Sequence, residues 1–142
     1  MSSAQDSMMK RNRAKMLFLK SVVGVVVVAL LSLFVWYNFL NPEVKAKRVV
    51  NNYLKAINKG QKTDEYKVPN ITDFYNVLEF NEIKDYKHLA VRTESHENNV
   101  DSYLLVYDVT ITDKVGIKYY RKVYFTVDNS GEDHKFRISK MD

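Results

Sequence analysis

The sequence contains no cysteine. Disulfide bonds, thiolate metal sites and lipid attachment to a cysteine behind an apolar segment are therefore excluded. An exported domain without disulfides that is rich in Lys, Asn, Ile and Tyr is more typical of bacteria than of eukaryotic secretion. We therefore expect a bacterial protein.

Glycine and histidine are scarce, which argues against several kinds of chemistry. Four glycines are spread over 142 residues, and they form no phosphate-binding loop. The three histidines, His88, His96 and His134, lack the spacing of a metal site. No G-x-S-x-G motif is present to supply a serine nucleophile. We therefore expect no metal, no cofactor and no enzyme activity.

Charged residues are absent from Ser21 to Pro42. At about 1.5 Å per residue, a helix of this length crosses the hydrocarbon core of a bilayer. Basic residues precede this segment and aromatic residues crowd its far end, as at membrane interfaces. The sequence thus predicts a transmembrane helix over residues 16–41, after a basic cytoplasmic tail over residues 1–15. The residues expected to anchor it are Arg11, Arg13, Lys15, Lys20, Trp36 and Tyr37.

The basic tail also predicts an orientation. Five of the 22 Lys and Arg residues precede residue 43, against one acidic residue, Asp6. The positive-inside rule places this end in the cytoplasm and residues 42–142 outside it, in a single-pass protein of the cell membrane. A signal peptide has the same order, but its apolar region is about 7–15 residues long and ends at small residues. We also expect residues 1–9, which show no apolar pattern, to be disordered.

The part of the chain after the apolar segment is nearly neutral. Residues 43–142 carry the other 17 basic and 16 acidic residues. The high isoelectric point therefore comes mainly from the tail, and the outside domain has no concentrated basic surface of the kind that binds nucleic acid. We expect membrane lipid and a protein as partners, and no nucleic acid.

A helix is predicted directly after the apolar segment. Asn41 suits the N-cap, Pro42 the first helical position and Glu43 the first turn, while Gly60 suits the end. Residues 61–70 are polar and predicted to be irregular. A short second helix is expected from Thr72 or Asp73. The apolar stripe of the first helix comprises Ala46, Val49, Val50, Tyr53, Leu54 and Ile57. The second helix is expected to turn Phe74, Val77 and Leu78 inward, with Ile71 as its staple.

The remainder of the chain predicts strands, from its alternation of apolar and polar residues and from its turn sequences. In the first strand, Leu89 and Val91 are expected on one side and His88 on the other. In the last, Phe136 and Ile138 are expected inward. Helices followed by an antiparallel meander indicate an α+β domain, with the helix packed on one face of a curved sheet. The strands are expected at residues 86–93, 103–112, 117–127 and 135–141.

The order of these segments resembles the NTF2-like superfamily, and in particular its small extracytoplasmic members tethered to Gram-positive membranes. The segments concerned are the helix after the anchor, YLLVYDVTIT, KYYRKVYFTV and HKFRIS. Cystatin-like domains share this plan. The resemblance covers roughly residues 42–141 and implies a pocket between helix and sheet, but the superfamily includes enzymes, binding modules and scaffolds. The final strand matches the pattern of many members through Gly131, Lys135, Phe136, Arg137 and Ile138.

The pairing of the two central strands is predicted from burial. Placing Tyr107 opposite Arg121 pairs Leu105 with Val123, so that the apolar faces coincide. A shift by one residue would bring Asp108 opposite Arg121. That ion pair is worth about 0.2–1 kcal/mol, whereas each buried Leu or Val contributes about 1.5–3 kcal/mol. We expect the apolar pairing, with Arg121 near an edge or cavity mouth and Asp108 on the far face.

The other face of the third strand is a candidate docking surface for a protein. Tyr and Arg are enriched at interfaces, and Leu104 and Val106 lie on the same side. A solvated sheet face is the alternative, because Tyr and Thr favour strands in any case. The candidate residues are Lys118, Tyr120, Lys122, Tyr124 and Arg137.

These observations favour a membrane-anchored, non-catalytic binding or scaffold protein of a cell-envelope, transporter or secretion/conjugation complex. A sensor that binds a small ligand or lipid in the pocket of the NTF2-like domain is the alternative. NTF2-like enzymes use a carboxylate with a tyrosine in that pocket, a role that Asp108 with Tyr107 or Tyr119 would have to fill. We expect Asp108 to point away from the core, which disfavours an enzyme.

Overall fold

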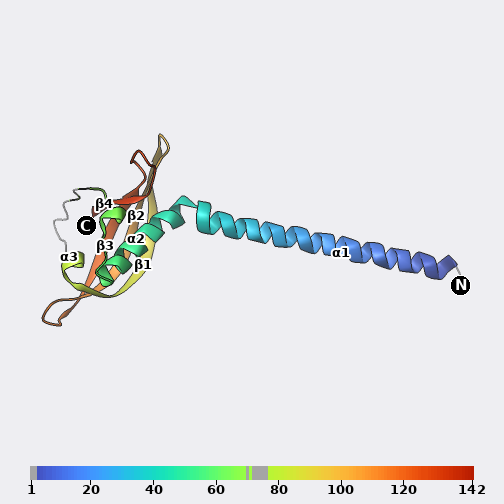
Figure 1. Cartoon of the computed structure of the whole chain (residues 1–142), viewed down its shortest axis with the longest axis horizontal. Coiled ribbons are helices and arrows are strands. Elements are labelled where there is room, and N and C mark those ends of the chain that lie inside the picture. The colour runs from blue at the N-terminus through green and yellow to red at the C-terminus, as the bar shows by residue number, and fades with distance from the viewer. Residues whose placement is uncertain (1–2, 70, 72–76) are drawn as a thin grey trace. The chain divides into compact units, whose positions relative to one another are not determined.

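The computed structural model describes residues 3–69, 71 and 77–142. The chain divides into two compact units, Met1–Leu40 and Asn41–Asp142, which are described separately below (Figure 1). The first unit contains helix α1 (Ser3–Val35) and a π-helical turn, η1 (Trp36–Leu40). The elements of the second unit are α2 (Pro42–Asn58), the 3-10 turn η2 (Asp64–Tyr66), α3 (Val77–Phe80), β1 (Glu82–Glu97), β2 (Val100–Thr112), β3 (Lys118–Asp128) and β4 (Arg137–Met141).

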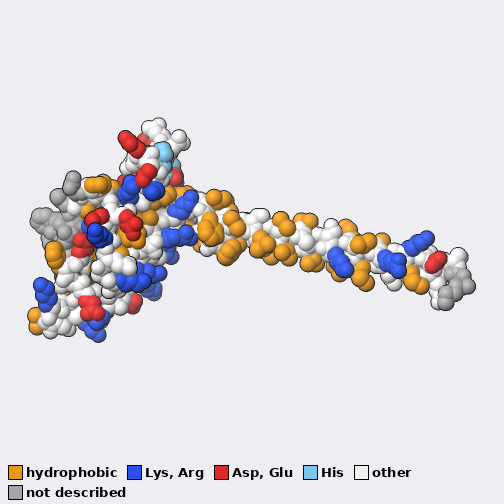
Figure 2. Space-filling view, viewed as in Figure 1, with side chains coloured by type: hydrophobic (Ala, Val, Ile, Leu, Met, Phe, Trp, Pro, Cys, Tyr) orange, Lys and Arg blue, Asp and Glu red, His pale blue; other side chains and the backbone are white. Residues whose placement is uncertain are grey.

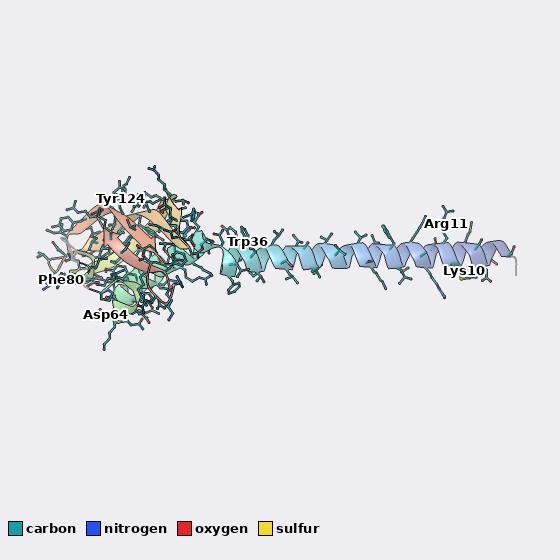
Figure 3. The ribbon with its side chains drawn as sticks, turned by 90° about the horizontal axis from the view of Figure 1, so that it is seen from above. Lys10, Arg11, Trp36, Asp64, Phe80 and Tyr124 are labelled. Carbon is teal, nitrogen blue, oxygen red and sulfur yellow. The ribbon has the colours of Figure 1, made fainter. Side chains whose placement is uncertain are left out.

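The first unit is one long apolar helix. Its segment Gln5–Leu40 has a mean hydropathy of 2.6 in its most apolar part and is long enough to cross a membrane. Figure 2 shows hydrophobic side chains along it, with Lys and Arg at its N-terminal end. Lys10 and Arg11 are labelled at that end in Figure 3, and Trp36 at the other.

The expectation of disorder in residues 1–9 is wrong for the residues described there, Ser3–Met9, which belong to α1. Neither glycine nor proline occurs before Gly24. Extending an existing helix adds a hydrogen bond for each residue fixed, without the cost of a new nucleus. The helix therefore extends toward the N-terminus through the polar tail.

Helix α2 begins and ends as predicted. The backbone N–H of Glu43 donates to Oδ1 of Asn41 at 3.0 Å, and Pro42 is the first helical residue. At the other end Gly60 has a φ of 62°, a conformation that costs glycine little. Tyr53 and Leu54, in the middle of the predicted apolar stripe, are fully buried.

The second unit is an α+β domain, as predicted. Its four strands form an antiparallel sheet in the order β1-β2-β3-β4, and α2 lies across one face and contacts all four strands (Figure 1). Phe136 and Ile138 pack against the core, as expected. The buried core comprises Ala46, Val50, Tyr53, Leu54, Leu78, Ile83, Tyr103, Leu105, Tyr107, Val109, Ile111, Phe125, Val127 and Ile138.

The second predicted helix is described only in part. Helix α3 contains the predicted inward residue Leu78, which is 5% exposed, and Ile71 packs against the core. The predicted start at Thr72 or Asp73 and the inward position of Phe74 lie outside the described residues. Before α3, the segment predicted to be irregular contains η2. It also contains a bridge from Lys67 to Ile138 of β4.

The register of β2 and β3 differs from the predicted one by two residues. Val109, not Tyr107, lies opposite Arg121, and Tyr107 lies opposite Val123. A shift of two residues leaves every side chain on the same face, because side chains alternate with period two. The predicted faces are therefore confirmed, including Asp108 on the far side from the core, whereas the predicted pairs are wrong.

The turn between β2 and β3 sets this register. The backbone N–H of Asp113 donates to the carbonyl of Ile117 at 3.0 Å, and that of Gly116 donates to the carbonyl of Asp113 at 3.0 Å. The Asp113 carboxylate also accepts from the N–H groups of Val115 and Ile117, each at 2.9 Å. Gly116 has a φ of 90°. A short loop closed in this way fixes the residue pairs beyond it.

Strand β1 departs most from prediction. It is twice the predicted length, and its pairing with β2 shifts at three points, between Ile83 and Asp85, His88 and Ala90, and Thr93 and Ser95. Each extra residue reverses the alternation that follows it. His88 consequently faces the core, edge-on to the Tyr107 ring at 5.2 Å between centroids, and Leu89 is 40% exposed. The predicted sides of His88 and Leu89 are wrong for this reason.

A tight turn explains the extra length of β1 and β2. Asn98 and Asn99 have φ angles of 52° and 63°, and Glu97 pairs with Val100. Two successive residues of positive φ match the right-handed twist of a two-residue hairpin, and asparagine tolerates that conformation. The two asparagines were the signal for this hairpin, which the sequence analysis missed.

Candidate functional site

The predicted docking residues of β3 lie together on the sheet face that α2 leaves open. We call this surface the outer face. Tyr120 pairs with Thr110 and Tyr124 with Val106, so that β2 and β3 contribute alternate residues to it. Figure 3 shows Tyr124 on the opposite side of the domain from Asp64, the first residue of η2. The outer face comprises Leu104, Val106, Asp108 and Thr110 of β2, and Lys118, Tyr120, Lys122 and Tyr124 of β3.

Two tyrosines make the outer face unusually apolar for an exposed surface. Tyr120 is 78% exposed and Tyr124 is 39% exposed, while Leu104 and Val106 beside them are only partly buried. Among the described residues, the hydroxyls of Tyr120 and Tyr124 make no hydrogen bond. Both rings therefore offer an apolar surface and an available hydroxyl, the combination that enriches tyrosine at interfaces.

The charge on the outer face is mainly positive. Lys118 and Lys122 are exposed, and Asp108 lies opposite Lys122. Among the ion pairs of the described residues, none includes either lysine. The acidic side chain therefore weakens the electrostatic field of Lys122 without fixing its position. Lys118 lies opposite Thr112, which carries no charge.

Arg137 lies on the same sheet face, on β4, but apart from the other predicted residues. It lies opposite Asp128, at the far end of β3 from Lys118. Its guanidinium binds the Asp133 carboxylate through two hydrogen bonds, of 3.1 and 2.6 Å. These bonds, followed by one from the Lys135 backbone, hold the pKa of Asp133 below its ordinary value. Arg137 therefore closes the loop between β3 and β4. Its guanidinium is already paired within the domain and would have to leave Asp133 to bind a partner.

A cavity of about 420 Å³ lies on the other side of the sheet. Leu78 and Ile111 are buried in its wall, and Val123 and Met141 are packed against the core. Arg121 lies on the same face of β3 as Val123 and is exposed at the cavity. The predicted position of Arg121 at a cavity mouth is confirmed. The described lining is Leu78, Ile111, Arg121, Lys122, Val123, Met141 and Asp142.

A chain of contacts positions Arg121. Its guanidinium carbon lies 5.8 Å from the centroid of the Tyr119 ring, and the Tyr119 hydroxyl donates to Oδ2 of Asp113 at 3.0 Å. This hydrogen bond raises the pKa of Tyr119. Bonds from the Ile117 backbone and from Tyr119 lower the pKa of Asp113, although slight burial opposes them. The hairpin turn thus holds Asp113, which holds Tyr119 beside the guanidinium.

A second polar cluster, which the sequence analysis missed, lies beneath α2. Oε1 of Glu79 accepts hydrogen bonds from Tyr53 at 2.9 Å, Lys67 at 2.6 Å and Thr63 at 3.3 Å. Burial raises the pKa of Glu79, but the bonds from Lys67 and Tyr53 outweigh it and the pKa lies below its ordinary value. The four residues are far apart in sequence, and no motif links them.

His88 is the third polar group that the fold places against the core. Its Nε2 is buried and has no partner among the described residues. Burial lowers the pKa of His88, and the charge of Lys47 lowers it further, against smaller opposing effects from Ala90 and Glu43. The neutral imidazole is therefore the form that fits the folded domain.

Asp108 and Tyr107, which were considered for an enzymatic role, lie on opposite faces of the sheet. Asp108 is on the outer face, whereas Tyr107 is fully buried on the other and donates to Oδ1 of Asn51 at 2.8 Å. Within the part of the chain that the structure describes, no three His, Asp or Glu side chains form a metal-binding group. The cavity and the outer face are therefore the two sites that suit binding.

No family model, curated protein or solved structure matches this chain.

Proposed function

We propose that this chain is a membrane-anchored, non-catalytic binding protein whose outer face docks an acidic surface of a protein partner. The observation that carries this proposal is the exposure of Tyr120, at 78%, on the same strand face as Tyr124, which lies opposite Val106. An isolated exposed tyrosine is ordinary. A strand face that gathers two tyrosines with aliphatic neighbours is a surface that a partner can desolvate.

The charges of the outer face define the partner's surface. Lys118 and Lys122 form no ion pair among the described residues, so a complementary surface would be acidic. Rim charges of this kind steer association and select against basic partners more than they add affinity. The tyrosines would supply most of the binding free energy.

The apolar helix supports a place in the cell membrane. In this proposal α1 spans the membrane once, with its basic end in the cytoplasm and the α+β domain outside. Lys, Arg and Trp near the ends of the helix would fix its depth. The α+β domain would be an NTF2-like module, in keeping with its helix-on-sheet plan and its cavity, and its partner would belong to an envelope, transporter or secretion/conjugation complex.

Site-directed photocrosslinking in native membranes tests the docking proposal. A photoreactive amino acid at Tyr120 of the full-length chain should trap one partner protein, whereas the same group at the exposed Lys62 should not. Lys118→Glu combined with Tyr124→Ala should reduce the trapped product roughly tenfold, because interface tyrosines contribute about 2 kcal/mol or more.

A matched variant controls for the change in charge. Lys55→Glu makes the same change in charge at an exposed lysine outside the outer face and should leave crosslinking at Tyr120 unchanged. Equal yields from the double variant and this control would return the outer face to an ordinary solvated surface.

A further inference from the structure

The cavity combines an apolar wall with a single guanidinium. Leu78 and Ile111 are 5% and 1% exposed, and Val123 and Met141 complete the wall. Arg121 projects from β3 on the same face as Val123. A cation beside apolar side chains is stabilised by an anion that satisfies its donors. Among the ion pairs of the described residues, none includes Arg121.

The guanidinium is held before any ligand arrives. Its guanidinium carbon lies 5.8 Å from the centroid of the Tyr119 ring, and among the hydrogen bonds and ion pairs of the described residues none uses its N–H donors. Tyr119 is itself fixed by Asp113. Because the position is set in advance, binding an anion costs little side-chain entropy.

The other charged residues of the lining do not cancel this charge. The Asp142 side chain pairs with Lys140, with 2.6 Å between Oδ2 and Nζ. Lys122 follows Arg121 and adds a second basic residue at the rim. The cavity therefore presents positive charge at its mouth and apolar side chains within.

We propose that this cavity binds a single-chain amphiphile with an acidic head, the head paired with Arg121 and the chain against Leu78, Ile111, Val123 and Met141. A volume of about 420 Å³ is within the usual range of ligand pockets and excludes a folded partner. Arginine binds both carboxylate and phosphate groups through paired N–H donors at its edge. The apolar wall of the cavity lies on the opposite sheet face from the docking surface, and Lys122 belongs to the rim of both.

Photolabelling of the full-length chain in phosphatidylcholine nanodiscs tests the proposal. The probe is a fatty acid with a diazirine in its chain, and the labelled positions are mapped by mass spectrometry. We expect labels on peptides that contain Leu78 and Met141. Arg121→Gln should reduce that labelling about tenfold, because it removes the charge-assisted hydrogen bonds to the acidic head. Lys118→Gln, on the same strand but the outer face, should not reduce it.

Two further probes identify the head group. Competition by an unlabelled alkyl phosphate would assign the site to phosphate heads as well as carboxylates, whereas protection by fatty acid alone would assign it to carboxylates. Equal labelling by the uncharged alcohol analogue, or labels confined to α1, would overturn the proposal. Far-UV circular dichroism and the melting temperature of Arg121→Gln should match the parent chain, so that lost labelling reports the site and not the fold.

Discussion

The Tyr53 hydroxyl and the Lys67 ammonium converge on the same oxygen of Glu79, at 2.9 and 2.6 Å. These groups come from α2, from the segment after η2 and from α3. Only 13% of the Lys67 side chain and 25% of the Glu79 side chain are exposed, so water competes only weakly for these hydrogen bonds. The carboxylate therefore fastens the connection between α2 and β1 to the underside of the helix.

Glu79→Gln should destabilise the domain by about 1–3 kcal/mol, since it leaves a partly buried ammonium without its counter-charge. Chemical denaturation followed by circular dichroism measures the change. Glu82→Gln is the matched control, because the Glu82 side chain is 63% exposed in its pair with Lys84. This variant should lower the free energy of unfolding by less than about 0.5 kcal/mol. Similar decreases in the free energy of unfolding of the two variants would show that the Glu79 cluster does not stabilise the fold.

The same carboxylate predicts a pH dependence of stability. The pKa of Glu79 is lower in the folded chain than its ordinary value of 4.5. Its contribution is therefore fully present above pH 4.5 and is lost as the pH falls through the lower, folded value. Denaturation curves collected from pH 6 downward should show a smaller acid-induced loss for Glu79→Gln than for the parent chain. Parallel curves would contradict the depressed pKa.

Protonation of His88 should also destabilise the domain, and it should do so at a higher pH than protonation of Glu79. Its pKa is lowered from 6.5 by burial, so the unfolded chain binds a proton before the folded one does. Stability should thus decline as the pH falls below 6.5. His88→Phe should flatten that decline in equilibrium denaturation, and its ring can keep the edge-on contact with Tyr107.

His134 provides the comparison for this experiment. It lies in the exposed loop before β4 with a φ of 50°, which asparagine tolerates. His134→Asn should therefore keep the slope of the parent chain. The interpretation of His88 would fail if its own variant kept that slope as well.

Asp113→Ala should lower the pKa of Tyr119, because the bond from the hydroxyl to Asp113 is the main cause of its elevation. Residue-specific NMR titration of carbon-labelled tyrosines measures this directly. The change should appear at Tyr119 and not at Tyr120, which faces the opposite side of the sheet. Asp133→Ala, in the next loop, should leave Tyr119 as it was.

The proposed topology predicts a protease pattern. Protease added to intact protoplasts should degrade the chain after Pro42 and spare the N-terminal tail. A C-terminal tag that survives while the membrane is intact, and is cleaved only after lysis, would reverse the orientation.

The same preparation distinguishes an anchor from a cleaved signal. Mass measurement of the membrane-extracted chain should show the basic tail still attached, because the apolar segment lacks a small-residue cleavage site. A soluble product that starts near residue 40 would identify a signal peptide instead.

The class of the fold followed from local patterns. The caps at Asn41 and Gly60, the helical stripe and the strand alternation each depend on nearby residues, and each gave the element that the structure shows. Burial of apolar side chains also fixed which face of β3 meets α2. These features require no knowledge of distant contacts.

The sequence did not predict features that depend on the exact number of residues in a loop or strand, or on contacts between distant residues. The closure of the loop at Asp113 places Val109 opposite Arg121, two residues from the predicted pairing. The same side chains are buried in either register, so burial could not distinguish the two. An inserted residue at Lys84 turned His88 toward the core. The Glu79 cluster joins residues up to 26 positions apart, and the ion pair between Arg137 and Asp133 closes a loop. None of these contacts has a periodic signal.

The three irregularities of β1 have a consequence for self-association. β1 is an edge of the sheet, and its 16 residues would otherwise offer a long row of free backbone groups to another chain. Extra residues spaced five apart interrupt that row, and Lys84 and Glu94 place charges at two of the interruptions. A foreign strand cannot keep its ladder along such an edge. This edge of the sheet is thereby protected against strand addition by another chain.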